Sequence, residues 1–291
     1  MYIMTEKKST QWLRQVPVVG EIIADQVEGR PLVNVLHIDG VIGRASGLRR
    51  AGINMSDMAE SIDQAFKGQQ LAAVALSINS PGGSPVQSAM IASRIRALAI
   101  EKEIPVFAFC EDVAASGGYW LACAADEIFA DPASIVGSIG VVFAGFGFPE
   151  MLAKIGIERR IHTAGEKKAI LDPFKNEDQD DVEILKELQA DIHEQFKAHV
   201  RDRRGDKLQA DESILFSGEF WTGNRALGLG LVDGLGDLRS IMREKVGENV
   251  KLKIVGRRRG WLEKRLGVRN EWADDLIEAV QTRALWTRYG L

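Results

Sequence analysis

The stretch Leu71-Ala-Ala-Val-Ala-Leu-Ser-Ile78 is a continuous run of small and apolar residues, and Asn79-Ser-Pro-Gly-Gly83 follows it directly. An uninterrupted apolar run is typical of a strand buried on both faces, and the proline and glycines end it in a tight loop. The pattern recurs where the apolar run 106–110 precedes Ala114-Ala-Ser-Gly-Gly118. These two units predict buried strands that end in glycine-rich loops.

Helical periodicity separates the strands. Apolar residues recur at roughly every 3.6 positions from Val86 through Met90 to Ile100, and an earlier short helix is expected to begin at a Ser56 cap. Strands that alternate with helices require crossover connections, so we predict an α/β fold, a mostly parallel sheet with surrounding helices. Further strands are expected at 32–38, 127–131 and 157–163, a short helix at 119–125, and a long helix with an apolar face between Val182 and Val200.

Composition indicates an ordinary globular protein. The chain has 291 residues, a net charge of −4, 45% hydrophobic and 27% charged residues, which argues against a disordered, collagenous or coiled-coil chain. Cys110 and Cys123 lie in apolar stretches, form no disulfide framework and favour a reducing compartment, so we expect a cytoplasmic location. A cleavable signal peptide is not expected, because Pro17, Gly20 and Glu21 interrupt the longest apolar stretch near the N-terminus, 16–23. No transmembrane segment is expected either, because turn-forming residues interrupt the charge-free runs 68–93 and 132–149.

Charge is distributed unevenly along the chain. Residues 251–291 hold ten basic and five acidic side chains and three of the six tryptophans, which leaves a net charge of −9 on residues 1–250. We therefore divide the chain into an N-terminal extension (1–30), a main domain (31–250) and a basic, tryptophan-bearing segment (251–291). This last segment either packs on the body or a neighbouring subunit, or makes a peripheral contact with the inner membrane face. Nucleic-acid binding is disfavoured, since the acidic body repels phosphate.

Ser116 is the candidate nucleophile. It stands at an expected strand-to-helix turn, where its hydroxyl projects and the amide of Gly117 faces the same reacting atom. The simpler interpretation of an isolated Ser-Gly-Gly is a helix cap, and neither glycine loop has the spacing of a phosphate-binding motif. None of the four histidines lies in a persuasive position for a base, although His162 remains an alternative, and the lysine pair at 167–168 could be a solvated turn.

Five blocks resemble the signal peptide peptidase A family of serine peptidases with a Ser/Lys dyad, related in fold to the Clp protease proteolytic subunit and to crotonase. They cover about residues 30–240 in the family's order, and only the five together are specific. The blocks are Asn79-Ser-Pro-Gly-Gly83, Ala114-Ala-Ser-Gly-Gly-Tyr-Trp120, Gly137-Ser-Ile-Gly-Val141, Gly165-Glu-Lys-Lys-Ala-Ile-Leu-Asp-Pro173 and Ala226-Leu-Gly-Leu-Gly-Leu-Val-Asp233.

The resemblance assigns roles within these blocks. It implies that Ser116 is the nucleophile, Lys168 the general base and Ser138 the residue that orients the lysine amine. The amides of Gly83 and Gly117 correspond to the oxyanion hole. It also implies a homo-oligomer, because related proteins form rings or domes in which neighbours complete the active site, and it implies neither a metal nor a cofactor. The substrates would be peptides, either remnant signal peptides or other unfolded apolar segments.

A lysine base needs an unusual environment. Its ordinary pKa of about 10.4 must fall to near 7, which costs about 4.6 kcal/mol of ammonium solvation. Apolar burial must supply this, so we expect Glu166 and Asp172 to point away from the amine and Lys167 to be structural or exposed. Two other functions use the same fold: a crotonase-like acyl-CoA hydratase or isomerase, which needs neither lysine nor serine, and a non-enzymatic scaffold.

Overall fold

The computed structural model describes residues 29–43, 53–256 and 285–290. Within these residues an eight-stranded sheet forms the centre, with strands in the order β6-β5-β3-β2-β1-β8; β4 also pairs with β3, and β7 pairs with β4. All of the pairings are parallel except that between β5 and β6. The strands are β1 (Leu32–Asp39), β2 (Leu71–Ser80), β3 (Val106–Ala115), β4 (Glu127–Ala130), β5 (Ile135–Gly137), β6 (Phe220–Thr222), β7 (Gly234–Leu235) and β8 (Lys251–Val255).

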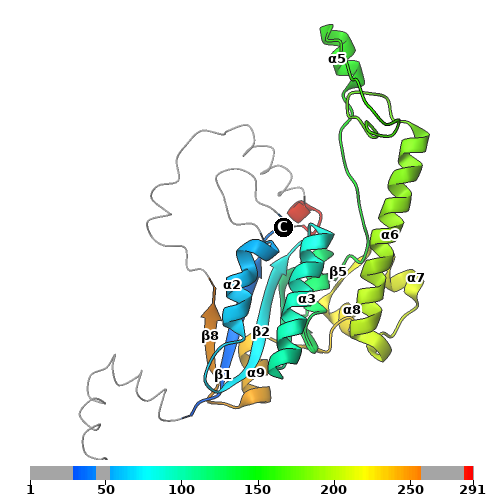
Figure 1. Ribbon diagram of the computed structural model, residues 1–291. Helices are drawn as coiled ribbons and strands as arrows, with labels where there is room; N and C mark the ends of the chain where they lie inside the picture. The colour runs from blue at the N-terminus through cyan, green and yellow to red at the C-terminus, as the bar shows by residue number, and fades with distance from the viewer. Residues whose placement is uncertain (1–28, 44–52, 257–284, 291) are drawn as a thin grey trace, which may run out of the picture.

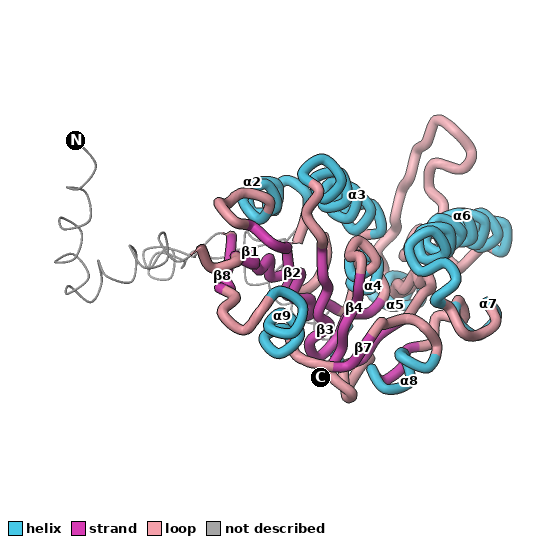
Figure 2. Tube along the Cα trace, turned by 90° about the horizontal axis from the view of Figure 1, so that it is seen from below, coloured by secondary structure: helices cyan, strands magenta, loops and turns pink. Residues whose placement is uncertain are grey.

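Helices cover both faces of this sheet. Figure 2 shows α2 and α3 on one side of the strands and α9 on the other. The first side holds the larger hydrophobic core, which includes Ile38, Leu76 and Ile78, whereas Val35 and Phe107 belong to the smaller core that contains Met242 of α9. The helices are α2 (Met55–Ala65), α3 (Pro85–Lys102), α4 (Gly117–Ala122), α5 (Pro149–Ile155), α6 (Gln179–Arg204), α7 (Glu212–Leu215), α8 (Gly223–Gly228) and α9 (Leu238–Val246), with a 3₁₀ turn at Gly205–Lys207.

The predicted fold class is confirmed, and most elements form where we expected them. Three details are wrong. The segment 157–163 is not a strand, and the cap of α2 is Asn54 rather than Ser56, because the Asn54 side chain accepts a hydrogen bond from the amide of Asp57. In α3, Val86 and Met90 are 64% and 47% exposed, because the buried stripe passes beside them. The buried residues are Ser88, Ile91, Ala92, Ile95, Leu98 and Ala99.

A long arm extends from the body. Residues 141–178 leave the sheet after β5, carry α5 and return at the amino end of α6, which Figure 1 shows well separated from the strands. The predicted long helix is confirmed as α6, with Asp178 as its cap, but only its carboxyl half is buried in the core, at Phe196 and Val200. The amino half supports the arm.

Parts of the C-terminal segment belong to the body. Residues 251–255 form β8, which pairs with β1, so this piece continues the domain that we expected to end at residue 250. Trp286 and Tyr289 pack against Val113, Ala115 and Ile135. The N-terminal residues 1–28 and residues 257–284, which make up most of the basic, tryptophan-bearing segment, lie outside the described residues.

Both cysteines are buried free thiols, as predicted. In the described part of the chain, no helix combines the length and the apolar character needed to span a bilayer.

Candidate active site

Two glycine loops meet at the carboxyl ends of β2 and β3. The strands are parallel, with Ser80 opposite Ala114, so both chains turn at the same edge. A side chain on Gly82 would lie 2.7 Å from the Ser116 Cβ, and one on Gly83 would lie 2.0 Å from the Ile42 carbonyl oxygen. The loops therefore pack backbone to backbone, which only glycine permits at these two positions.

Ser116 lies at the turn between β3 and α4 in an unfavourable backbone conformation, with φ 53° and ψ −122°. It precedes the helix, yet its side chain makes no capping hydrogen bond, so the cap interpretation is wrong. The residue is partly exposed, whereas its neighbours Ala115 and Gly117 are buried. A strained serine with an uncommitted, accessible hydroxyl at a strand-to-helix turn has the geometry of an exposed nucleophile.

Gly83 and Gly117 lie side by side next to this serine. An ideal Cβ on Gly117 would be 3.4 Å from the Gly83 nitrogen, and one on Gly82 would be 2.9 Å from the Gly117 nitrogen. The two backbone amides that we predicted to act together are thus brought together by the two loops. Adjacent amides of this kind can stabilise an oxyanion that develops beside the serine.

Ser138 is placed beside the same turn. The Ser116 amide donates to the Gly137 carbonyl at 2.8 Å, and Ala115 pairs with Gly137 across β3 and β5. Ser138 is buried and also has a φ of 53°, and its amide donates to the Glu219 carbonyl at 2.6 Å. The structure therefore brings together four of the five predicted site residues, and each comes from the end of a strand.

Lys168 is the exception. Both Lys167 and Lys168 are exposed, so the apolar enclosure that we expected around Lys168 does not form within one chain. The lysine loop is fastened to the amino end of α6, where the Asp181 carboxylate accepts from the Leu171 amide at 3.2 Å. At 1.5 Å per residue, Asp181 is about 18 Å along α6 from His193, which contacts the segment next to Ser138.

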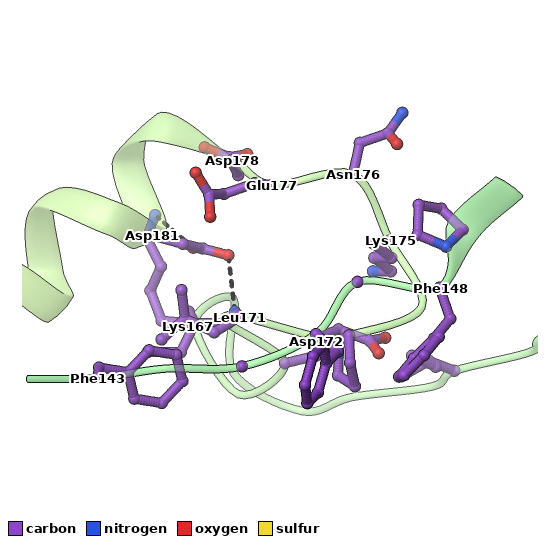
Figure 3. Close-up of a pocket in the computed structure, with 18 of the residues that line it drawn as sticks. Phe143, Phe148, Lys167, Leu171, Asp172, Lys175, Asn176, Glu177, Asp178 and Asp181 are labelled. Carbon is purple, nitrogen blue, oxygen red and sulfur yellow. Dashed lines mark hydrogen bonds and ion pairs between the residues drawn. The ribbon is translucent and has the colours of Figure 1, made fainter. Parts of the chain in front are cut away.

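The arm encloses a pocket of about 1210 Å³. Figure 3 shows Lys167, Asp181 and Leu171 on one side of it, with Phe143 and Phe148 on the arm segment that passes beside it. The Asp172 side chain is 4% exposed and pairs with Arg159 at 3.3 Å, so it is engaged inside the arm, whereas Glu166 is exposed. Several apolar side chains of the arm are exposed, namely Val142, Phe143, Phe146, Met151, Ile155 and Ile157.

Two residues near the site were missed. His193 and His199 of α6 each contact a backbone carbonyl of a segment that carries a predicted catalytic residue, Ile139 and Trp120 respectively. Their acceptors are main-chain atoms, which leave no signal in the sequence. His162 is exposed on the arm.

Comparisons with known proteins identify the family of this chain. The model of peptidase family S49 matches residues 99–253. The probable protease SohB of Haemophilus influenzae is 31% identical over 268 residues, which cover 91% of this chain and 71% of that protein. A mutant of the 1510-N membrane-bound stomatin-specific protease in complex with a substrate peptide has a TM-score of 0.50 at 16% identity, covering 86% of this chain and 98% of that one, a likeness that shows the fold alone.

A Brucella abortus protein is 48% identical over 272 residues, which cover 89% of this chain but only 37% of that protein. That longer protein is named Na(+)/H(+) antiporter NhaA. Because this chain spans only 37% of its length, the name is not transferred to this chain. The family model matches more than half of this chain. The chain belongs to peptidase family S49.

Proposed function

We propose that the protein is a serine endopeptidase that cleaves peptides through an acyl-enzyme on Ser116. The observation that carries this proposal is the accessible, strained serine set against the adjacent Gly83 and Gly117 amides. Attack by the Ser116 oxygen on a peptide carbonyl forms the ester bond, and the two amides stabilise the oxyanion. The C–N bond then breaks, the amine leaves with a proton, and water hydrolyses the ester to regenerate the serine.

Lys168 is the proposed base, supplied by a second copy of the chain. Within one chain the lysine loop is fastened to the far end of α6 from the segment next to Ser138, so Ser116 and Lys168 do not form a pair there. The arm that carries Lys168 exposes large apolar side chains, including Phe146 at 78% and Val142 at 69%. Exposed apolar clusters mark interaction surfaces, and burial against a neighbour would provide the low-polarity setting that a neutral lysine needs.

The substrates we propose are unfolded apolar segments, because a loop-bordered serine accepts an extended chain more readily than a folded domain. Peptide as the substrate class is supported by the fold neighbour that was solved with a substrate peptide. We also propose a cytoplasmic location, consistent with the two free thiols. Contact of residues 251–291 with an anionic membrane remains a prediction, which co-sedimentation with anionic vesicles, with and without residues 251–291, would test.

Trapping of the acyl-enzyme tests the proposed function. A fluorophosphonate should label wild-type protein, and mass spectrometry should place the adduct on Ser116. The variant Ser116→Ala should lose both labelling and peptide hydrolysis, while Lys167→Ala should keep most of its activity. Labelling at another serine, or hydrolysis that survives in Ser116→Ala, would contradict the proposal.

A further inference from the structure

Helix α6 contacts both segments that carry the serines of the site. The His193 Nε2 lies 3.1 Å from the Ile139 carbonyl oxygen, and the His199 Nε2 lies 3.1 Å from the Trp120 carbonyl oxygen. A carbonyl only accepts hydrogen bonds, so in each ring Nε2 carries the proton and donates. The two rings are six residues apart and reach different segments from one rigid element.

The first of these contacts holds a strained turn. Ile139 follows Ser138, whose φ of 53° is unfavourable for a side chain larger than glycine. The Ser138 amide is fixed by the Glu219 carbonyl at 2.6 Å, and the Ser138 carbonyl accepts from the Gly140 amide at 3.0 Å. His193 adds the hydrogen bond to the next carbonyl, so the turn is held on both sides of Ser138.

The second contact holds the helix that follows the nucleophile. The Trp120 amide donates to the Ser116 carbonyl at 3.0 Å, so Trp120 is one helical turn from the nucleophile. Its ring stacks on His199, with centroids 5.1 Å apart, and on Phe196, with centroids 4.8 Å apart. Arg203, also on α6, donates to the Cys123 carbonyl at 2.9 Å. Side chains of α6 therefore cap the carboxyl end of α4 and pack against its tryptophan.

We propose that His193 and His199 are positioning residues for the peptidase reaction, His193 acting through Ser138 and His199 acting through α4 on Ser116. This inference rests on the proposed function. Both rings donate hydrogen bonds from one helix to the segments that carry the two serines. Groups that hold such segments in place keep the reacting atoms in the geometry that catalysis requires. Burial lowers the pKa of His199, although its hydrogen bond to the Trp120 carbonyl opposes this shift.

Steady-state kinetics on His193 variants test the first half. His193→Gln keeps a donor at the Nε2 position and should keep kcat within about twofold, whereas His193→Leu and His193→Asn should lower kcat about tenfold with KM nearly unchanged. Asparagine is polar but too short to reach the Ile139 carbonyl. A lower kcat in a His193→Asn variant that still folds is therefore caused by the lost hydrogen bond and not by misfolding. Gln195→Leu, on an exposed position of the same helix, is the matched control and should equal wild type.

A double-mutant cycle tests whether His193 acts through Ser138. Ser138→Ala should slow the reaction, and adding His193→Asn to it should slow the reaction no further. Equal kcat in wild type and His193→Asn, or losses that multiply in the double variant, would overturn the assignment. Ser116→Ala is measured alongside: if that variant stays active, the proposed function itself fails, whatever His193 does.

The rate of fluorophosphonate labelling at Ser116 tests whether His199 positions Ser116 through α4. His199→Leu should lower the second-order labelling rate about tenfold, and His199→Gln should restore most of it. Thermal unfolding is measured on each variant. A labelling rate in His199→Leu that equals wild type would overturn the role of His199, as would a loss that His199→Gln does not rescue in folded protein.

Discussion

The backbone amide of Ser116 donates to the carbonyl of Gly137 at 2.8 Å, which sets Ser116 beside Ser138 at the ends of β3 and β5. Both serines have φ 53°, a conformation that costs about 1–3 kcal/mol and persists only where surrounding contacts determine it. Two strained serines in adjacent, hydrogen-bonded segments are a stronger indication of a catalytic site than either residue alone.

Mixing two inactive variants should restore activity. Ser116→Ala keeps the lysine and Lys168→Ala keeps the serine, so a 1:1 assembly of copies places both intact groups at about a quarter of the interfaces if neighbours exchange freely. The measurement is peptide hydrolysis after the two variants are mixed under conditions that allow subunit exchange. Replacing the first variant with the double variant Ser116→Ala/Lys168→Ala removes every intact pair and serves as the control. A mixture of freely exchanging copies that stays inactive would show that the base does not come from a neighbour.

Gly83→Ala should abolish both activity and correct folding of the loop. Its φ is +143°, and the added methyl would lie 2.0 Å from the carbonyl oxygen of Ile42, so the backbone must move. Gly228 is the matched control, because it lies in α8 and has no atom within 4 Å of the added methyl. Gly228→Ala should leave activity unchanged and stabilise the protein by about 0.5–1 kcal/mol in urea unfolding. Normal hydrolysis by Gly83→Ala would refute the proposed oxyanion loop.

Asp233 should make stability depend on acid pH. Burial acts to raise the pKa of Asp233, but hydrogen bonds from Arg204, Lys207 and the Ile128 amide outweigh it and the pKa lies below the ordinary 3.8. A lowered pKa stabilises the fold fully above the unfolded value, and this contribution is lost as the pH falls through the folded value.

Asp233→Asn should cost about 3–5 kcal/mol at pH 7, because Arg204 is 2% exposed and would lose its counter-ion at 2.6 Å. Urea unfolding between pH 7 and pH 3 should show a smaller loss of stability in the variant than in wild type. Glu183→Gln, at an exposed position of α6, should follow the wild-type curve. If the free energy of unfolding depends on pH identically in wild type and Asp233→Asn, Asp233 is not the group that causes the loss of stability in acid.

The two cysteines should resist alkylation in the folded protein. Burial raises the pKa of both Cys110 and Cys123 to about 12, and a thiol must ionise to react. Iodoacetamide at pH 8 should therefore label neither residue in native protein and both in urea, as counted by intact mass. Rapid native labelling would mean that the core around α4 opens readily.

The strands and glycine loops could be predicted because their signals are local. A continuous apolar run followed by Pro-Gly-Gly restricts the chain to a buried strand and a tight turn, whatever lies elsewhere. The position of the site at Ser116 could be predicted from these two strands, because the carboxyl ends of parallel strands lie at the same edge of a sheet and bring their loops together. The first half of the α3 face was misjudged, because Val86 and Met90 fit the apolar period but are exposed, while Ser88 and Ile91 take the buried positions.

The position of Lys168 could not be predicted from its motif. The spacing to Pro173 identifies Lys168 within its motif but does not give its position in space. That position depends on the length of α6 and on the contact between Asp181 and Leu171. The histidines of α6 were missed for a related reason. Neither histidine lies in a persuasive position for a base, yet each ring contacts a main-chain carbonyl, which no sequence pattern marks.

The contact between Tyr289 and Pro81 joins residues 208 positions apart, with the hydroxyl 3.5 Å from the Pro81 carbonyl oxygen in the loop that carries Gly83. β8 likewise joins β1 across most of the chain. Both contacts involve the described residues that leave the ribosome last. During synthesis the strand beside β1 and the support of the Gly83 loop are therefore added only after the chain that carries Ser116 has been made.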